Sequence, residues 1–478
     1  MKLLTLQIIK QMKKTFTIAM LTTIGLIFPF LSVNTVHAQT ITGGAYHSIF
    51  LCNDSTAMTV GDNDYGQLGD GTNQNSSTPM LVSSLTGIIA LSGGADHSLF
   101  LKQGSTAWST GENSYGQLGD GTTVDKVTPV QVNGLTQIAK IATGDYFSLF
   151  LKPDGTVWAC GENGSGQLGV GTTTDEILPV QVNGLTDIVA MAGGAYFTLF
   201  LKSDSTVWAT GNNLHGQLGD GTNVGKLTPV QISSLTGIIA IACGGYHSLF
   251  LKEDSTVWAC GFNSTGQLGN GTNLNSNTPV QITSLQGIIA VQTGYAHSLF
   301  LKQNGTVWSC GRNTSGQLGD GTTVSKNTPV QVIGLTEILV LGGGENHSLF
   351  LKNDNTVWSC GTNSSGQLGN GTTASDSIVV NVIGLCTLAS SALELTNNHL
   401  PFNIYPNPGK GNFTIALPNI IEQAITEIKI MSSLGSPVYQ TILKQKNETI
   451  ETNLPAGIYF VLLSTEKEMG VKKLVIEQ

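Results

Sequence analysis

The sequence has 478 residues, of which 59 are glycine and 11% are charged. Because glycine is about twice as frequent as usual and helix-forming residues are few, a coiled coil, a helical bundle and a disordered chain are excluded. The formal net charge of -9 comes from an acidic body, with 23 acidic and 11 basic residues between positions 39 and 390, and it argues against nucleic-acid binding.

The first 38 residues have the order of a secretory signal. Lysines at positions 13 and 14 precede an apolar run over residues 16–31, and compact residues lead up to a cleavage position between Ala38 and Gln39. The run is short for a membrane span. We therefore expect a signal peptide over residues 1–38, with translation starting at either Met1 or Met12.

From residue 41 to residue 390 the chain repeats itself every 50 residues. One block reads Gly-Gln-Leu-Gly-x-Gly-Thr, a second reads x-Ser-Leu-Phe-Leu-Lys, and a third reads Thr-Val-Trp. The first block begins at Gly66, Gly116, Gly166, Gly216, Gly266, Gly316 and Gly366. Such a period is typical of stacked supersecondary units that bury a face only against their neighbours.

Each repeat predicts four short strands. The second and third blocks flank a turn that is typical of a hairpin, and two further strands follow as Pro-Val-Gln-Val and Ile-Ile-Ala-Ile. The sequence therefore predicts an all-β chain with a seven-bladed β-propeller over residues 39–390. The last repeat ends at Leu385 without its Ile-rich strand, and residues 40–44 look like the missing end. We expect the first and last segments to meet in one blade and close the ring.

The Gly-Gln-Leu-Gly-x-Gly-Thr block, with His-Ser-Leu and Gly-x-Asn beside it, resembles the regulator of chromosome condensation repeat. The resemblance covers all seven repeats and implies the same propeller. The founding nuclear member acts as an exchange factor on a small GTPase and binds chromatin, but neither partner is expected for an acidic chain with a secretory signal. A secreted bacterial inhibitor of β-lactamases is a functional analogue, which implies that such a propeller can bind protein.

After a linker over residues 391–400, residues 401–478 predict a small immunoglobulin-like β-sandwich, because short alternating strands are separated by turns. The segments 402–408 and 455–461 resemble the C-terminal sorting domain of type IX secretion cargo in Bacteroidetes-type bacteria. That resemblance implies contact with the export machinery, secretion across the outer membrane, and an extracellular or cell-surface location. It leaves open whether the sorting domain is later removed.

No residue pattern indicates catalysis, a cofactor or a metal site. A repeated histidine shares its position in the repeat with Phe147 and Phe197, and a ligand or a general base cannot be exchanged for Phe, so we interpret it as an aromatic core residue. It occurs at His47, His97, His247, His297 and His347. In the same way, the cysteines at 160, 260, 310 and 360 share a small buried position, and the six Trp share a core position.

The tyrosines of the repeats fall in two loops of the repeat and outside the repeated core positions. They are Tyr46, Tyr65, Tyr115, Tyr146, Tyr196, Tyr246 and Tyr295. In the family that the chain resembles, these two loops lie on one face around the central opening. The same loops hold Asp62, Asp96, Glu112, Asp145, Glu162, His215, Phe262, Arg312 and Glu345. Variable aromatic residues on a rigid scaffold are typical of a recognition surface, and packing over the blade edge explains the tyrosines equally well.

We therefore expect an exported propeller that binds a partner protein through this tyrosine-rich loop face. Binding of a glycan is the alternative, because exposed tyrosine rings stack on sugars as readily as on peptides. The third hypothesis is that the chain is an enzyme, which would need an acid–base cluster built from His215, Glu112, Glu162 and Asp145.

Overall fold

The computed structural model describes residues 40–388 and, in the tail, residues 403–405, 412–416, 426–432, 437–443, 447–451, 454, 457–464 and 469–476. The expected signal segment over residues 1–38, with its cleavage position at Ala38 and Gln39, and the linker over residues 391–400 lie outside these described residues. The propeller and the tail belong to two separate units of the chain. No helix in the described part of the chain is long and apolar enough to cross a membrane.

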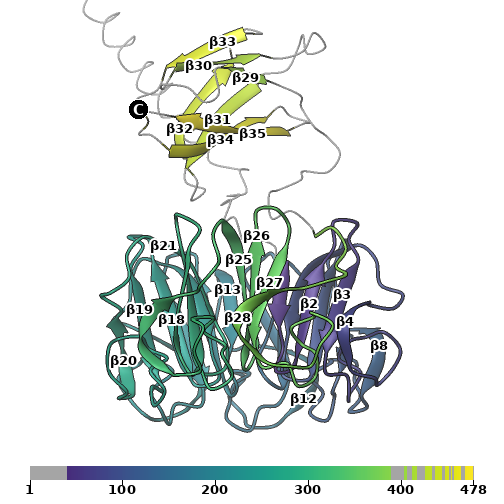
Figure 1. Ribbon diagram of the computed structural model, residues 1–478. Helices are drawn as coiled ribbons and strands as arrows, with labels where there is room; N and C mark the ends of the chain where they lie inside the picture. The colour runs from purple at the N-terminus through teal and green to yellow at the C-terminus, as the bar shows by residue number, and fades with distance from the viewer. Residues whose placement is uncertain are drawn as a thin grey trace, which may run out of the picture. The chain divides into compact units, whose positions relative to one another are not determined.

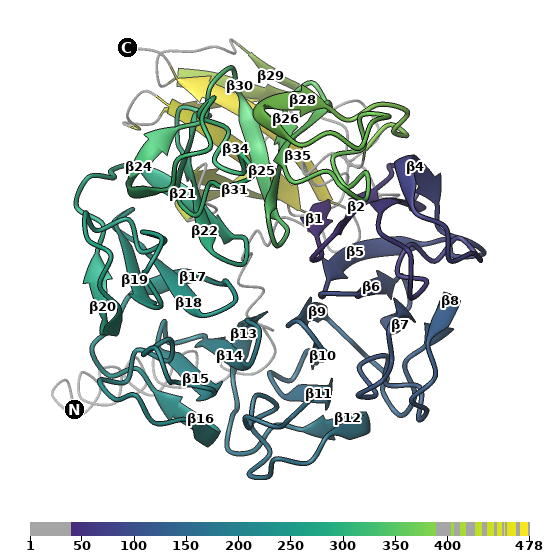
Figure 2. The same ribbon diagram turned by 60° about the horizontal axis from the view of Figure 1, so that its bottom comes forward.

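Seven four-stranded antiparallel sheets form a ring around a central opening (Figure 1, Figure 2). Their first strands, nearest the centre, are β1 (Ile41–Gly43), β5 (Ile88–Gly93), β9 (Lys140–Thr143), β13 (Ile188–Gly193), β17 (Ile238–Cys243), β21 (Ile288–Thr293) and β25 (Ile338–Gly343). The second strands are β2 (His47–Leu51), β6 (His97–Lys102), β10 (Phe147–Leu151), β14 (Phe197–Lys202), β18 (His247–Lys252), β22 (His297–Lys302) and β26 (His347–Lys352). The third strands are β3 (Ala57–Gly61), β7 (Thr106–Gly111), β11 (Val157–Gly161), β15 (Val207–Gly211), β19 (Val257–Gly261), β23 (Val307–Gly311) and β27 (Val357–Gly361). The outer strands are β4 (Ser76–Leu81), β8 (Lys126–Gln131), β12 (Glu176–Gln181), β16 (Lys226–Gln231), β20 (Ser276–Gln281), β24 (Lys326–Gln331) and β28 (Asp376–Asn381). The prediction of an all-β seven-bladed propeller is confirmed.

The cores of the propeller lie between neighbouring blades, which is why the second strand of each sheet is apolar on both faces. In β10, Leu149 packs into one cluster with Phe200 of the following blade. Phe150, the next residue, packs into another cluster with Leu99 of the preceding blade. Successive side chains of a strand point to opposite faces, so each blade is held from both sides and no blade buries its faces alone.

Both ends of the propeller meet in its first blade, as expected. In this blade Ile41 of β1 stands opposite Phe50 of β2, and Leu388 forms an isolated antiparallel bridge with Cys52. Leu388 thereby takes the register that Ile88 has in the second blade, where it faces Lys102. The innermost strand of the first blade is thus assembled from the two ends of the repeat region, and this closes the ring.

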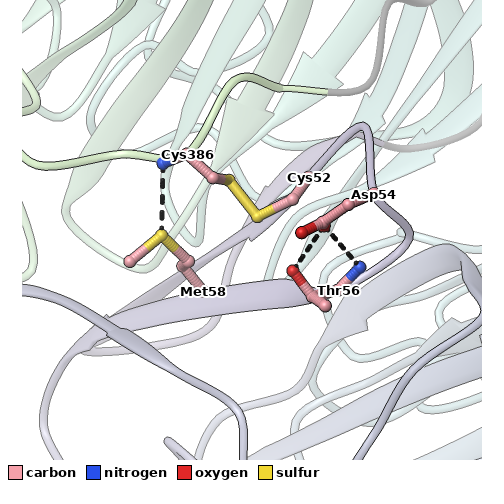
Figure 3. The surroundings of a disulfide bond; sticks show 5 residues. All are labelled: Cys52, Asp54, Thr56, Met58 and Cys386. Atoms are coloured by element: carbon pink, nitrogen blue, oxygen red, sulfur yellow. Dashed lines mark hydrogen bonds between the residues drawn. A yellow bond between two sulfur atoms is a disulfide. The ribbon is translucent and has the colours of Figure 1, made fainter.

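A disulfide between Cys52 and Cys386 closes the same junction covalently (Figure 3). This disulfide was not expected from the sequence. In four other blades a lysine at the Cys52 position lies over a tryptophan at the Met58 position, with the ammonium nitrogen 4.3–6.0 Å from the ring centroid. In the first blade both partners are replaced, and the backbone amide of Cys386 donates a hydrogen bond to the Met58 sulfur at 3.3 Å. All six tryptophans pack against the cores between the blades, as their shared position predicts, but they are only partly buried.

The tail forms two sheets that share one core. The three-stranded sheet contains β29 (Asn403–Tyr405), β30 (Asn412–Ala416) and β33 (Asn447–Glu451). The four-stranded sheet contains β31 (Thr426–Ser432), β32 (Pro437–Leu443), β34 (Gly457–Ser464) and β35 (Met469–Ile476). Phe413 and Ile450 from the first sheet pack with Ile428 and Val461 from the second, which gives the small sandwich that the alternating strands predict.

Candidate functional site

Two loops of every blade meet on one side of the ring, which we call the loop face. It consists of the inner loops at residues 44–46, 94–96, 144–146, 194–196, 244–246, 294–296 and 344–346, and of the long loops that begin at residues 62, 112, 162, 212, 262, 312 and 362. In each blade the first amide of the long loop donates to a carbonyl of the inner loop, as Phe262 donates to Tyr246 at 2.8 Å. Gly261 permits this approach, because it has φ +105° and a Cβ there would lie 2.4 Å from the Tyr246 oxygen.

The inner loops are also bonded to one another around the central opening. The amide of Ala45 donates to the carbonyl of Ala95 at 3.0 Å, and Ala95 donates to Asp145 at 2.9 Å. Equivalent bonds continue through each following blade and return to the first blade through Glu345. The loop face is therefore built around a closed annulus of backbone hydrogen bonds, which keeps its variable side chains at fixed positions.

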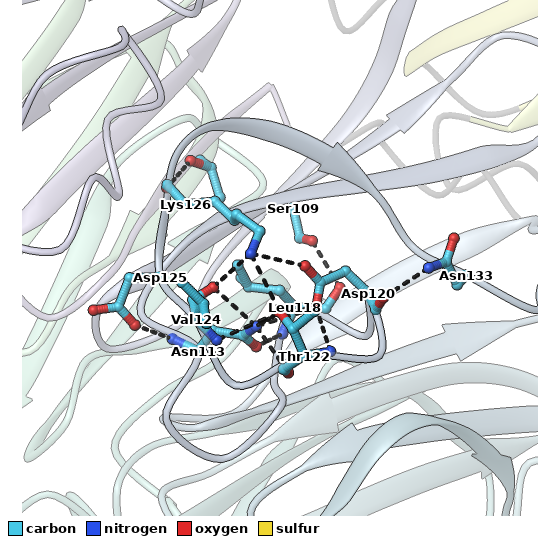
Figure 4. A network of polar contacts seen from close by, with 10 residues as sticks. Ser109, Asn113, Leu118, Asp120, Thr122, Val124, Asp125, Lys126 and Asn133 are labelled. Carbon is cyan, nitrogen blue, oxygen red and sulfur yellow. Dashed lines mark hydrogen bonds and ion pairs between the residues drawn. The ribbon is translucent and has the colours of Figure 1, made fainter.

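A buried asparagine organises each long loop, as Asn113 does in the second blade (Figure 4). Its amide nitrogen donates to the carbonyl oxygens of Thr122 at 3.0 Å and Val124 at 3.2 Å, and its oxygen accepts from the amide of Leu118 at 3.0 Å. Gln117 of the repeated Gly-Gln-Leu-Gly block then accepts from the amide of Tyr115 at 3.0 Å. The Asn and Gln residues that recur in every repeat thus hold the long loops, and these loops carry the residues that differ most between repeats.

The structure brings five of the expected site residues into one aromatic band. The ring centroid of Tyr246 lies 6.0 Å from that of Tyr196, 5.8 Å from that of Tyr295 and 5.4 Å from that of His215. His215 in turn lies 4.8 Å from Phe262. These separations are typical of favourable aromatic pairs, so the band is a continuous surface across three blades.

The remaining tyrosines lie in the first three blades. Tyr115 and Tyr146 form a second pair with ring centroids 5.6 Å apart. Tyr65 is 41% exposed and Tyr115 is 37% exposed, whereas the other five tyrosines are half-buried. Tyr46 is hydrogen-bonded to Glu345, and burial with that carboxylate raises the pKa of Tyr46. Arg312 donates through Nε to Thr314 at 3.1 Å.

A cavity of about 350 Å³ lies at the centre of the annulus. Half of its 24 lining residues are glycines, which lie at the ends of the first strands and in the inner loops. The larger side chains that line it are those of Tyr46, Asp96, Asp145, Tyr146, Tyr196, Tyr295 and Glu345. The cavity therefore combines tyrosine rings with carboxylates, and Tyr65, Tyr115, Tyr246 and Phe262 are not among its lining residues.

Burial and mutual repulsion raise the pKa values of several carboxyl groups on the loop face. Burial, followed by repulsion from Glu112 and other carboxylates, raises the pKa of Asp96 to about 7. Burial and the neighbouring Glu345 and Glu162 likewise raise the pKa of Asp145 to about 7. The pKa of Glu162 also rises to about 7, mainly because of burial. The fold thus keeps these carboxyl groups close together although their charged forms repel one another.

The acid–base cluster that an enzyme would need is not assembled around His215. Its ring contacts Tyr246 and Phe262, and its Nδ1 lies 3.4 Å from the amide nitrogen of Asn275. Glu112, Glu162 and Asp145 instead influence one another and Asp96. Within the described residues, no three His, Cys, Asp or Glu side chains are grouped to hold a metal ion.

The repeated histidines are buried, as the aromatic-core interpretation expects. The Nε2 atom of His47 lies 2.9 Å from the hydroxyl of Ser98, which itself donates to the carbonyl of Gln67 at 2.8 Å. The hydroxyl proton is therefore already used, so His47 donates from Nε2. Burial lowers the pKa of His47 to about 3, which agrees with a structural role.

Sequence reasoning missed two apolar residues on the long loops. Leu214, which directly precedes His215, is 71% exposed, and Leu274 is 75% exposed. Leu214 was detectable, because its position in the repeat otherwise holds Asp, Ser, Gly or Thr. Leu274 was less conspicuous, because valine occupies its position in three other repeats.

Family comparisons agree with both parts of the chain. A model of the RCC1-like domain matches residues 136–393, and models of the regulator of chromosome condensation (RCC1) repeat match residues 58–101, 106–151 and 88–117. A model of the secretion system C-terminal sorting domain matches residues 403–477. The protein is therefore exported across the outer membrane to the cell surface or the extracellular space, and its tail interacts with the export machinery. No curated protein matches the chain in sequence.

Solved structures show the same fold at low identity. Human WBSCR16 is 24% identical over 65% of this chain and 85% of its own, with a TM-score of 0.59. Prp20p from Saccharomyces cerevisiae, described with its binding properties to Gsp1p and histones, is 22% identical over 77% of this chain and 90% of its own, with a TM-score of 0.63. Yeast RCC1 (Prp20) bound to Kap60 is 21% identical over 80% of this chain and 92% of its own, also at 0.63.

Proposed function

We propose that the propeller of this chain, which belongs to the RCC1-like domain family, binds a partner protein through the loop face. The observation that carries the proposal is the aromatic band of Tyr196, Tyr246, Tyr295, His215 and Phe262. Aromatic residues dominate the energetics of protein interfaces because each buries a large area with few rotatable bonds.

The annulus supports this proposal because it fixes the band before a partner arrives. Each inner loop is bonded to its neighbour and to its own long loop, so binding has little backbone freedom to remove. Thr40 and Leu388, the first and last described residues of the propeller, lie toward the side opposite the loop face, next to the hairpin turn at residues 53–55.

Glycan binding is the second candidate, and the cavity is the observation that favours it. Tyr46, Tyr146, Tyr196 and Tyr295 line a space of about 350 Å³, a volume in the range of small-ligand sites. Protein binding comes first because Tyr65, Tyr115 and Leu214 extend the apolar surface beyond the cavity. Catalysis comes third, because His215 lies apart from the carboxylates that would have to work with it.

The experiment compares the chain with a variant in which Tyr46, Tyr146, Tyr196 and Tyr246 are changed to Ala. Both are immobilised and exposed to an extract of surface proteins and to a glycan array. We expect a protein that the wild type retains and the variant binds more weakly by about two orders of magnitude. Loss of array binding in the variant would favour a glycan ligand instead.

A matched control changes Glu253 and Gln303, two exposed residues of the hairpin turns on the opposite side, to Ala. This control is expected to retain the same protein as the wild type. If the tyrosine variant binds as the wild type does, the tyrosines only pack against their blades, and the proposal is wrong.

A further inference from the structure

The acidic residues that line or border the cavity lie in the first three blades and in the seventh, whereas tyrosines occur in each of the first six blades. The first three blades carry Asp62, Asp96, Glu112, Asp145 and Glu162, and the aromatic band occupies the next three. Glu345 of the seventh blade lines the cavity together with Asp96 and Asp145. A ligand that covers the whole face would therefore contact carboxylates in one part and the aromatic band in the other.

The acidic half of the loop face comprises Asp62, Asp96, Glu112, Asp145, Glu162 and Glu345, and among residues 40–388 no lysine or arginine forms an ion pair with it. The four ion pairs among residues 40–388 join lysines to other carboxylates, namely Asp120, Asp220, Asp320 and Asp354. Arg312 belongs to the sixth blade, and it donates its Nε hydrogen bond to Thr314 rather than to an acid. The negative charge on the loop face is thus left without an ion-pair partner among the described residues.

Two buried carboxylate oxygens of the acidic half also lack a hydrogen-bond donor. Glu112 is nine-tenths buried, and its Oε2 has no hydrogen-bond partner. The Oε2 of Glu162 is also buried and without a partner. A buried carboxylate oxygen that lacks a hydrogen bond destabilises the fold, and a ligand group that donates to this oxygen would remove that cost. Such groups are typical of sites that are completed by a ligand.

We propose that the acidic half of the loop face receives a basic side chain, lysine or arginine, from the partner protein, while the aromatic band packs against apolar residues beside it. The proposal rests on the proposed function and names the chemistry of the partner. Asp96, Asp145 and Glu345 surround the cavity into which the cation would extend. Carboxylates around a concave site concentrate the negative potential there, and tyrosine faces attract the same cation.

The repeats themselves supply substitutions that test this proposal with little disturbance of the fold. Asn346 occupies the position of Asp96, Ala195 that of Asp145, and Asn212 that of Glu162. The variant D96N/D145A/E162N therefore removes three carboxyl groups, which are largely ionised at pH 8, and uses only residues that this scaffold already holds. We expect it to unfold at a temperature at least as high as the wild type at pH 8, because carboxylates that repel one another are removed.

The control variant D154N/D204N/D254N makes the same change of charge in the hairpin turns. Each of these aspartates accepts hydrogen bonds from the threonine two residues later, and Asn304 already performs this task in another turn. Any effect of net charge alone appears in both variants, whereas an effect of the loop face appears only in the first.

The probe is a random-peptide display library selected on the immobilised full chain at about 50 mM salt. We expect the selected peptides to be enriched in Lys or Arg next to aromatic or aliphatic residues. Their affinity should fall about tenfold or more for D96N/D145A/E162N, stay unchanged for D154N/D204N/D254N, and weaken steeply at about 500 mM salt.

Two results would overturn the proposal in different ways. Peptides that lack basic residues, bind all charge variants equally and are lost only with Y246A would refute the cationic anchor and leave the proposed function standing. A selection that yields no peptide dependent on either the carboxylates or the tyrosines would contradict both proposals.

Discussion

Replacing Cys52 and Cys386 together by Ser is expected to lower the free energy of unfolding by about 4 kcal/mol. The disulfide joins residues separated by 334 positions, so in the unfolded chain it restricts a very long loop. In the folded chain it holds the last segment against the first blade, where Leu388 bridges Cys52 and shares a core with Ile41. Urea unfolding of the oxidised wild type and of the double variant measures the difference.

The control for this experiment is Cys243→Ser, because Cys243 is a free cysteine within β17. It is expected to change the free energy of unfolding far less than the double variant does. Native protein in which residues 52 and 386 both react with a thiol reagent would contradict the covalent closure. So would a double variant that unfolds at the same urea concentration as the wild type.

Changing Asn113 to Ala is expected to destabilise the propeller by about 3 kcal/mol, the second-largest effect on the fold that we anticipate. The substitution leaves the amide of Leu118 and the carbonyls of Thr122 and Val124 without their shared partner in a buried place. We also expect faster amide hydrogen exchange over residues 112–125. Tyr115 lies on this loop, so the same change loosens one edge of the loop face.

The comparison is Val124→Ala in the same loop, where the side chain is 62% exposed while its carbonyl still accepts from Asn113. This variant should unfold within a few tenths of a kcal/mol of the wild type. If Asn113→Ala exchanges its amides no faster than Val124→Ala, the asparagine does not organise the loop.

The fold was predictable from the sequence because the same pattern of strands occurs in seven copies. The period, the hairpin turns and the Ile-rich strand define four strands for each blade, and the missing final strand points to closure by the first residues. The disulfide was not predicted, although its signal was present. Cys52 and Met58 replace the lysine and tryptophan of other blades, and Cys386 also departs from its position in the repeat.

The candidate site was predictable only as a set of residues. Sequence position identified the two loops that carry the tyrosines, because departures from the repeat are visible by comparison of the copies. The contacts between these side chains depend on the distance between neighbouring blades. That distance cannot be derived directly from the sequence. The structure therefore adds the band around Tyr246 and the separate acidic group around Asp96.

Site-specific cross-linking tests the claim of a binding loop face most directly. A photoreactive amino acid is placed at Tyr115 or at Leu214, in different blades of the loop face, and at Gln103 or Gln303 in the hairpin turns. The chain is then displayed in its native export host and irradiated. We predict one partner protein that is captured from Tyr115 and from Leu214 and from neither hairpin position. Capture of that protein from Gln103 or Gln303, with none from the loop face, would contradict the claim.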